Sequence, residues 1–369
     1  MKILELKMNN FRSYNKLDLK FNPSKNIIIG KNGEGKTNIV EAIYVLALTK
    51  SFRGSKDEVI IKNDEESMKV EGKVKDKSSK KYQITLNREG IKKVKIDSTN
   101  INRLSDYLSN INIVLFTSED LNLIKDTPST RRKLIDIELS QFSNEYLKLL
   151  TLYNKVLKQR NSYLKMLYLN GNSSKDYLNI LTNQLIELGM KIYKYRSEFI
   201  DDINNFIENN YYTITGTHNL ILNYKSSFAN KDKESLVKQY KKELDRDITQ
   251  GKTNSGIHHD DYEFTLDGNN LKDFGSEGEQ KNAIISLKMA EIDIFRERKN
   301  IIPILILDDL FGNLDKQKIS NILKFIDDDI QTFVTTTELN KISKQLKDGS
   351  SIFLVKNGVV KEQNVWKTK

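Results

Sequence analysis

Eight residues near the start of the chain have the types and spacing needed to hold phosphate. The segment Gly30-Lys31-Asn32-Gly33-Glu34-Gly35-Lys36-Thr37 matches the pattern G-x-x-x-x-G-K-[ST], and Asn38 follows it. Its glycines allow backbone N–H groups to turn around phosphate oxygens. Lys36 would reach the terminal phosphates and Thr37 would place its hydroxyl on Mg²⁺. The segment follows the apolar strand pattern 26–29 and precedes a helical pattern, so it predicts a nucleotide site.

A second acidic motif lies far along the chain. The very apolar run Ile304–Leu307 predicts a buried strand, and it ends in Asp308 and Asp309. Paired carboxylates at such a strand end are typical of a Walker B segment. We expect Asp308 to hold Mg²⁺ through a water molecule, and Asp309 to orient or deprotonate the attacking water.

A third motif lies about thirty residues before the acidic pair. Phe274–Gln280 contains Ser276 and Gly278 in the form Ser-x-Gly-[Glu/Gln] at the start of a predicted helix, which resembles the signature of ABC-type ATPases. The loop after the acidic pair ends at Asp315 in the Leu-Asp form of the same class. By this resemblance the signature of one subunit covers nucleotide held by another, which implies an ATP-dependent homodimer.

The motif spacing favours an ATPase head divided by an insertion. About 270 residues separate Lys36 from Asp308, far more than in small kinases and GTPases. Strand patterns alternate with helical ones near both ends, whereas helical spacing dominates from about residue 131 to 209, broken by the polar turn 170–174. We therefore expect an α/β fold: residues 1–127 and 211–369 as an ABC-type P-loop ATPase head, and residues 128–210 as an inserted α-helical hairpin, the arm domain.

The amino-acid composition restricts the cellular compartment in which the chain is expected to work, and it favours a polyanionic binding partner. The 369 residues carry a formal net charge of +10 and no cysteine, and no apolar run reaches the roughly 18–20 residues that span a bilayer. A cytoplasmic location without a membrane partner is expected. The charge is compatible with nucleic acid, although a lysine-rich composition alone gives the same excess.

Several further segments make the chain resemble the RecF family, in the SMC-like branch of ABC-type ATPases. They are Asn9–Tyr14 with Arg12, Thr37–Tyr44, Phe116–Asp136 with Arg131 and Arg132, Leu157–Asn161, and the stretch around His258 and Asp260-Asp261. The last stretch departs from the family pattern: Ile257 and His259 stand where the family has Pro and Arg. Thr335–Thr337 occupies the strand end where transporters carry a switch histidine.

The RecF resemblance implies a function in recombinational repair and replication restart. ATP and Mg²⁺ are the implied cofactors, hydrolysis is expected to be slow, and DNA, as duplex and as single-strand/duplex junctions, is the implied partner near the nucleoid. The resemblance also implies action with RecR and RecO to load RecA at gapped DNA. Arg12 is expected near the nucleotide, although Arg12 and Arg53 are equally compatible with solvated surface positions. The main alternative is an ABC-type ATPase subunit of a transport or other non-DNA complex.

Overall fold

The computed structural model describes residues 1–54, 56–170, 174–312 and 314–363, which form two compact units. Unit 1 contains residues 1–122, 210–216 and 284–369, and unit 2 contains residues 123–209 and 217–283. Two of the boundaries fall within long helices, α5 (Lys175–Thr215) and α9 (Glu277–Lys299). None of the described helices combines the length and hydropathy that crossing a membrane requires.

Unit 1 contains a largely parallel sheet at whose edge the two distant nucleotide motifs meet. Its order is β15-β14-β3-β13-β12-β8, parallel except for the pairing of β14 with β15. The strands are β3 (Lys25–Ile29), β8 (Ile113–Thr117), β12 (Ile304–Asp308), β13 (Thr332–Thr336), β14 (Ser351–Lys356) and β15 (Val359–Gln363). Because β3 and β12 both pair with β13, their carboxyl ends lie at one edge of the sheet, although the chain positions are far apart.

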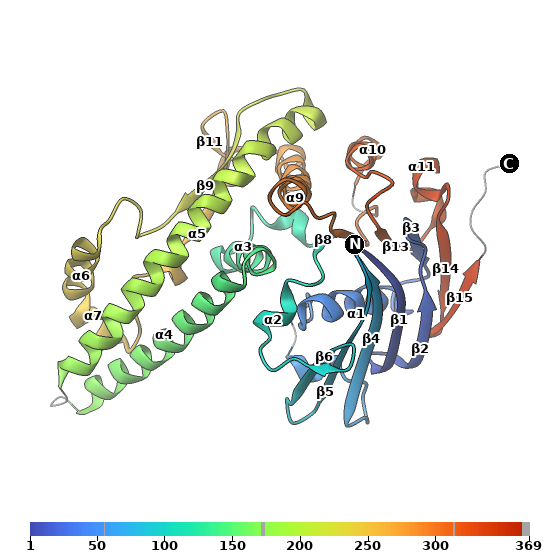
Figure 1. Cartoon of the computed structure of the whole chain (residues 1–369). Helices are drawn as coiled ribbons and strands as arrows, with labels where there is room; N and C mark the ends of the chain where they lie inside the picture. Colours follow the sequence, from blue (N-terminus) through green and yellow to red (C-terminus); the bar gives the residue numbers. More distant parts are fainter. Residues whose placement is uncertain (55, 171–173, 313, 364–369) are drawn as a thin grey trace. The chain divides into compact units, whose positions relative to one another are not determined.

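A second, antiparallel sheet completes the framework of unit 1 (Figure 1). Its order is β2-β1-β4-β5-β6-β7, and all pairings are antiparallel. The strands are β1 (Lys2–Phe11), β2 (Tyr14–Lys20), β4 (Ser67–Lys75), β5 (Ser79–Asn87), β6 (Lys92–Ile96) and β7 (Thr99–Asn100). The short helices of unit 1 are α2 (Ser105–Leu108), α10 (Lys316–Lys324) and α11 (Lys344–Lys347).

Helix α1 (Lys36–Leu48) contacts both sheets and fills the core of unit 1. Its residues 39–48 are all buried, which explains why the sequence is apolar around the helix rather than along one stripe. The helix comes so close to β4 that an ideal Cβ on Gly72 would lie 2.2 Å from Cδ2 of Leu46. The first turn of α1 is therefore held rigidly by the packing of its later turns.

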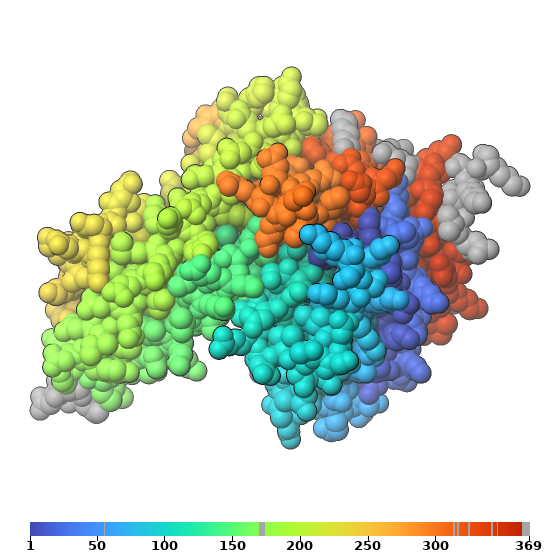
Figure 2. All heavy atoms as spheres, in the orientation of Figure 1, coloured from blue at the N-terminus to red at the C-terminus, as the bar shows by residue number. Residues whose placement is uncertain are grey.

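Unit 2 consists of a helical hairpin and a small sheet. The hairpin helices are α4 (Asn144–Asn170) and α5, and α3 (Pro128–Phe142) precedes them. The sheet has the order β11-β10-β9, with β9 (Leu220–Lys225), β10 (Asp261–Leu266) and β11 (Asn269–Asn270), and the other helices are α6 (Lys233–Lys242), α7 (Leu244–Gln250) and α8 (Leu271–Phe274). In Figure 2 the heavy atoms of α4, α5 and α6, green to yellow, form one closely packed surface.

The helical region differs from the sequence prediction in three details. The expected single helix from about residue 131 to 169 is two helices, because Ser143 has extended backbone angles and its hydroxyl accepts the N–H of Tyr146 to begin α4. Helix α5 continues past the expected end near residue 209, and α6 and α7 add two helices within residues 211–369, the segment expected to belong to the head. Residues 171–173 of the predicted turn lie outside the described residues.

Unit 2 is also larger than the predicted arm of residues 128–210. Buried ion pairs join the hairpin to residues expected in the head: Arg160 on α4 contacts Asp247, and Arg196 on α5 contacts Asp260. All four side chains are about 1% exposed, so neither contact is a loose surface pairing. Sequence periodicity defines helices but not such long-range contacts, and residues 217–283 therefore group with the hairpin in the structure.

The close approach at Gly72 gives a test of this packing. Gly72→Ala should lower the free energy of unfolding by about 1–3 kcal/mol, because the added methyl group collides with Leu46. Without that contact, alanine in a strand would be neutral or slightly stabilising. Urea unfolding of the single variants and of the Gly72→Ala/Leu46→Ala double variant forms the test, in which we expect the second change to relieve part of the first. Strict additivity of the two effects would contradict the contact.

Candidate nucleotide site

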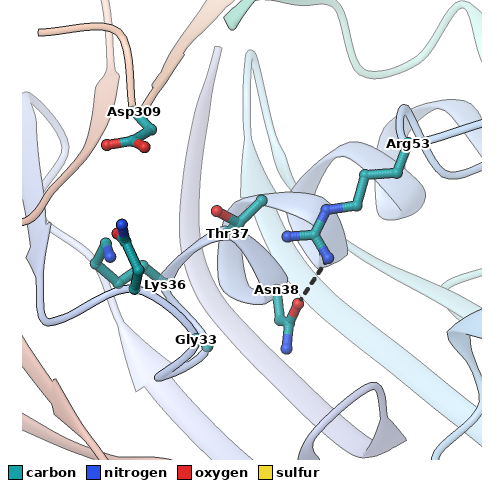
Figure 3. Close-up of a pocket in the computed structure, with 8 residues that line it drawn as sticks. Gly33, Lys36, Thr37, Asn38, Arg53 and Asp309 are labelled. Atoms are coloured by element: carbon teal, nitrogen blue, oxygen red, sulfur yellow. Dashed lines mark hydrogen bonds between the residues drawn. The ribbon is translucent and has the colours of Figure 1, made fainter. Parts of the chain in front are cut away.

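A cavity of 410 Å³ lies at the start of α1, where the phosphate-loop motif and the acidic pair meet. It is lined by the side chains or backbone of eight residues: Asn32, Gly33, Gly35, Lys36, Thr37, Asn38, Arg53 and Asp309. Figure 3 shows the carboxylate of Asp309 across the cavity from Lys36, and Arg53 with Asn38 on the other side of Thr37. The structure thus brings together residues from both ends of the sequence.

The glycines of the phosphate loop are required by its backbone shape. Gly33 and Gly35 have φ values of 83° and 108°, in the left-handed region that side-chain-bearing residues rarely adopt. Gly30 is needed for a different reason, since a Cβ there would lie 2.4 Å from the carbonyl oxygen of Val355. The loop is closed internally by Glu34, whose Oε2 accepts the backbone N–H of Lys31 at 3.0 Å. These features leave a loop of backbone groups around the cavity floor.

Lys36 is the cation placed at the base of this loop. It is buried, and its Nζ donates to the backbone carbonyl of Lys31 at 3.0 Å. Burial lowers the pKa of Lys36, and the nearby carboxylates of Asp309 and Asp308 act in the opposite direction. The lysine is therefore held by groups that phosphate oxygens can replace. By contrast, Lys31 belongs to the loop through its backbone, and its own side chain is exposed.

Asp308 joins the two motifs directly. Its Oδ1 accepts a hydrogen bond from the hydroxyl of Thr37 at 3.1 Å and another from the hydroxyl of Thr335 at 2.6 Å. Burial raises the pKa of Asp308, while both hydroxyl donors favour its ionised form. A threonine hydroxyl and a carboxylate that meet at this distance supply the oxygen ligands that Mg²⁺ prefers. The residues predicted to hold the metal therefore fit it.

Asp309 follows the last residue of β12, and its own backbone conformation determines its orientation. Its φ of 49° lies in the left-handed region, which is uncommon outside glycine, and its N–H donates to the hydroxyl of Thr335 at 2.9 Å. This conformation turns its side chain toward the cavity. Thr335 was noted in the sequence only as a residue at the position of the transporters' histidine, and its contacts with both aspartates assign it a positioning role.

Arg12 and Arg53 meet at a buried carboxylate that sequence reasoning did not single out. Glu41, on the second turn of α1, has no exposed side-chain surface. Arg12 donates to both of its oxygens, at 2.9 and 2.6 Å, and Nη1 of Arg53 lies 3.5 Å from Oε2. The hydroxyl of Ser51 also donates to Glu41. The only sequence indication was the position of Glu41, four residues after Thr37 on the same helix.

These contacts give the two arginines different positions. The Arg12 guanidinium is held by Glu41 and the carbonyl of Val59, and Arg12 is not among the residues that line the cavity. Arg53 does line it, and donates to Oδ1 of Asn38 at 3.1 Å. Arg53, considered equally compatible with a solvated surface position, is thus the arginine of the two that lines the cavity.

The signature residues Ser276 and Gly278 belong to unit 2 and form the start of α9. The hydroxyl of Ser276 donates to Glu279 at 2.8 Å and accepts the backbone N–H of Glu279 at 3.3 Å. The carboxylate of Glu279 accepts the N–H of Ser276 at 2.8 Å, which completes a reciprocal helix cap. Next to Gly278, only Oγ of Ser276, at 3.9 Å, would lie within 4 Å of an added Cβ among the described residues.

Two other predicted residues have local structural contacts. Asp315 caps α10, since its Oδ1 accepts the N–H of Lys318 at 2.9 Å, and it is absent from the residues that line the described cavity. His258 in unit 2 has its Nδ1 2.7 Å from the hydroxyl of Tyr153, and burial lowers its pKa to about 4. His258 is therefore neutral and hydrogen-bonded, which is the behaviour of a structural histidine. Asn313, in the loop between the acidic pair and Asp315, lies outside the described residues.

Comparison with known proteins identifies the family to which the chain belongs, and this family agrees with the nucleotide site described above. The model of the "RecF/RecN/SMC N terminal domain" family matches residues 2–361. The DNA replication and repair protein RecF of Ligilactobacillus salivarius (strain UCC118) is 38% identical over 99% of this chain and 98% of its own. RecF of Bacillus cereus (strain G9842) is 39% identical over 98% of both chains.

Solved structures agree with these relatives. A structure titled "Structure of the recombination mediator protein RecF-ATP in RecFOR pathway" has a TM-score of 0.91 at 30% identity, over 98% of this chain and 97% of that one. The Smc head domain of Pyrococcus furiosus has a TM-score of 0.53 at 18% identity, which supports the shared fold. The motifs are thus accounted for without the alternative that the chain is a subunit of a transport ATPase.

The divided phosphate-loop and acidic motifs on this sheet define an ABC-type P-loop ATPase head of the SMC kind. Within that class, the chain belongs to the RecF family of DNA replication and repair proteins. ATP binding and ATPase activity follow from membership of this family.

The buried carboxylate at Glu41 gives a test of the site's framework. Glu41→Ala should lower the free energy of unfolding by about 3–5 kcal/mol, because it removes the buried carboxylate that pairs with the mostly buried Arg12. Arg53→Ala should cost about 1 kcal/mol or less, since the Arg53 side chain is 38% exposed and its pairing is screened by solvent. Thermal and urea unfolding of the two variants measure the difference. Equal, small losses would show that Glu41 does not hold the network together.

Proposed function

We propose that the chain is an ATP-driven switch on DNA in which two copies close together around ATP and hydrolysis releases them. The observation that carries the proposal is the meeting of Lys36, Thr37 and Asp308 at one edge of the parallel sheet. This arrangement provides a cation for the phosphates and oxygen ligands for Mg²⁺ in the same cavity. A nucleoside triphosphatase requires these groups in its active site. The relatives named above are repair proteins.

Each residue of the cavity has a distinct part in the proposed reaction. Lys36 exchanges its contact with the Lys31 carbonyl for the terminal phosphates of ATP, and the loop N–H groups orient the phosphate chain. Thr37 and Asp308 would hold Mg²⁺, which when bound offsets phosphate charge. Asp309 orients the attacking water and accepts its proton. Thr335 fixes both aspartates through its hydroxyl.

The proposed partner for this half-site is a second copy of the chain. Ser276 and Gly278 begin the 23-residue helix α9, and the start of such a helix attracts anions through its N–H groups and dipole. In the proposed dimer they cover the γ-phosphate of ATP that the other copy holds. One copy alone then provides only half of the complete site. The homodimer is accordingly an ATP-dependent state.

The proposed output is control of DNA binding rather than transport. The second carboxylate of the acidic pair is Asp309, and Thr335–Thr337 stands where transporters have a histidine, both of which favour slow hydrolysis that times release. RecF membership supports action with RecR and RecO at gapped DNA, where RecA is loaded onto single strands. Duplex DNA and single-strand/duplex junctions are the proposed substrates of the closed dimer.

The lysine of the phosphate loop provides the first test. Lys36→Ala should weaken ATP binding by about a hundredfold or more, because it removes a charge-assisted contact at the base of the cavity. Lys31→Ala is the matched control: it removes an exposed lysine from the same loop but keeps the backbone contacts, so it should bind ATP nearly as the parent does. Calorimetric titration measures both. Unchanged affinity in Lys36→Ala would overturn the assignment of the site.

The signature serine tests the dimer separately. Ser276→Arg should bind ATP with the affinity of the parent, because the phosphate loop of each chain is intact, yet remain a monomer because the arginine blocks the partner's phosphates. Sedimentation velocity with a non-hydrolysable ATP analogue distinguishes the two states. A normal analogue-dependent dimer in this variant would rule out the proposed contact across the interface.

A further inference from the structure

The antiparallel sheet of unit 1 has two faces of opposite character. Its buried face packs on α1 through side chains such as Leu6, Met8 and Val70. On the other face, directly paired residues of neighbouring strands form rows across the sheet. One row runs from Lys16 on β2 through β1 and β4, where Lys69 lies, to Lys93 on β6.

Two further rows on the same face also contain lysines. The second crosses the same strands and includes Lys7 on β1 and Lys95 on β6. The third includes Lys20 on β2, Lys73 on β4 and Lys81 on β5. The three rows together define what we call the lysine face, which carries eight lysines on five adjacent strands.

The acidic residues on the lysine face are too few to neutralise it. They are Glu5, Asp18 and Glu71, so the face has a formal charge of +5, half of the +10 of the whole chain. Glu71 is buried between Lys69 and Lys81, at 2.9 and 2.8 Å, and Asp18 lies 2.8 Å from Lys7. This pairing leaves the greater part of the positive charge uncompensated.

Five lysines of the face provide this excess. Within the described part of the chain, no carboxylate lies within ion-pairing distance of any of them: Lys16, Lys20, Lys73, Lys93 and Lys95. Four are exposed and Lys95 is half-buried. Strands lie about 4.8 Å apart, so the rows extend roughly 19 Å across the sheet, which is enough to face several phosphates on one side of a nucleic acid.

The chemistry of the lysine face favours the phosphate backbone over the bases. The remaining positions of the rows are Asn9, Gln83 and Thr85, so among the described residues of this face there is no aromatic side chain on which an unpaired base could stack. Lysines are point charges on flexible stems and contact phosphates without reading sequence. A regular array of charges therefore suits a duplex better than a single strand.

We propose that the lysine face is the surface on which this chain holds duplex DNA, by its phosphates and without sequence preference. The inference rests on the proposed function, since it names the surface through which the ATP-driven switch acts on DNA. Helix α1 lies against the opposite face of the same sheet, and an ideal Cβ on Gly72 would press on Leu46 of that helix. The strands that carry the lysines are therefore packed directly on the helix that begins at Lys36.

The test replaces four exposed lysines of the face in the full-length chain. The variant Lys16→Gln/Lys20→Gln/Lys73→Gln/Lys93→Gln should bind a mixed-sequence 30-base-pair duplex roughly tenfold or more weakly at moderate salt, measured by fluorescence anisotropy with a non-hydrolysable ATP analogue. The slope of log affinity against log salt should fall by up to about 3–4, because each lost phosphate contact removes about 0.9. ATP affinity and melting temperature should stay at the parent values, because these side chains are outside the cavity.

A matched variant controls for net charge. Lys155→Gln/Lys158→Gln/Lys238→Gln/Lys241→Gln removes four exposed lysines of unit 2 and should keep the parent affinity and slope. Parent-like duplex binding by the first variant, or equal losses in both, would overturn the lysine face as the DNA surface. A larger loss for a 30-nucleotide single strand than for the duplex would also overturn it. If the parent itself binds no DNA with the analogue, the proposed function fails instead.

Discussion

The hydrogen bond between Thr37 and Asp308 is the constraint on which the rest of the structure depends. It joins residues 271 positions apart, and it exists because β3 and β12 both pair in parallel with β13. Thr335, at the end of that middle strand, adds a second bond to Asp308 and holds the backbone of Asp309. Three adjacent strand ends thus place a hydroxyl, two carboxylates and the phosphate-loop lysine around one cavity.

Residues with strong local patterns could be predicted from the sequence. The phosphate loop, the strand before it and the buried strand before Asp308 all form where expected, because their chemistry is contained in short segments. The RecF resemblance was confirmed by relatives across nearly the whole chain. Local pattern also gave the correct fold class, an α/β head with helices inserted between its two parts.

Long-range pairing could not be predicted in the same way. Glu41 is one polar residue within an apolar helix, and only the fold shows that Arg12 and Arg53 converge on it. The break at Ser143 and the ion pairs of Arg160 and Arg196 likewise depend on contacts between distant segments. The lysine face became visible only through strand register, because its residues come from five separate strands.

The central claim is that two copies complete each ATP site, and the dependence of turnover on protein concentration tests it most directly. At saturating ATP and Mg²⁺, the hydrolysis rate per chain should rise with protein concentration and reach a plateau once the dimer dominates. The Ser276→Arg chain should show no such rise. A rate per chain that stays constant from nanomolar to micromolar protein, with the chain monomeric throughout, would contradict the account.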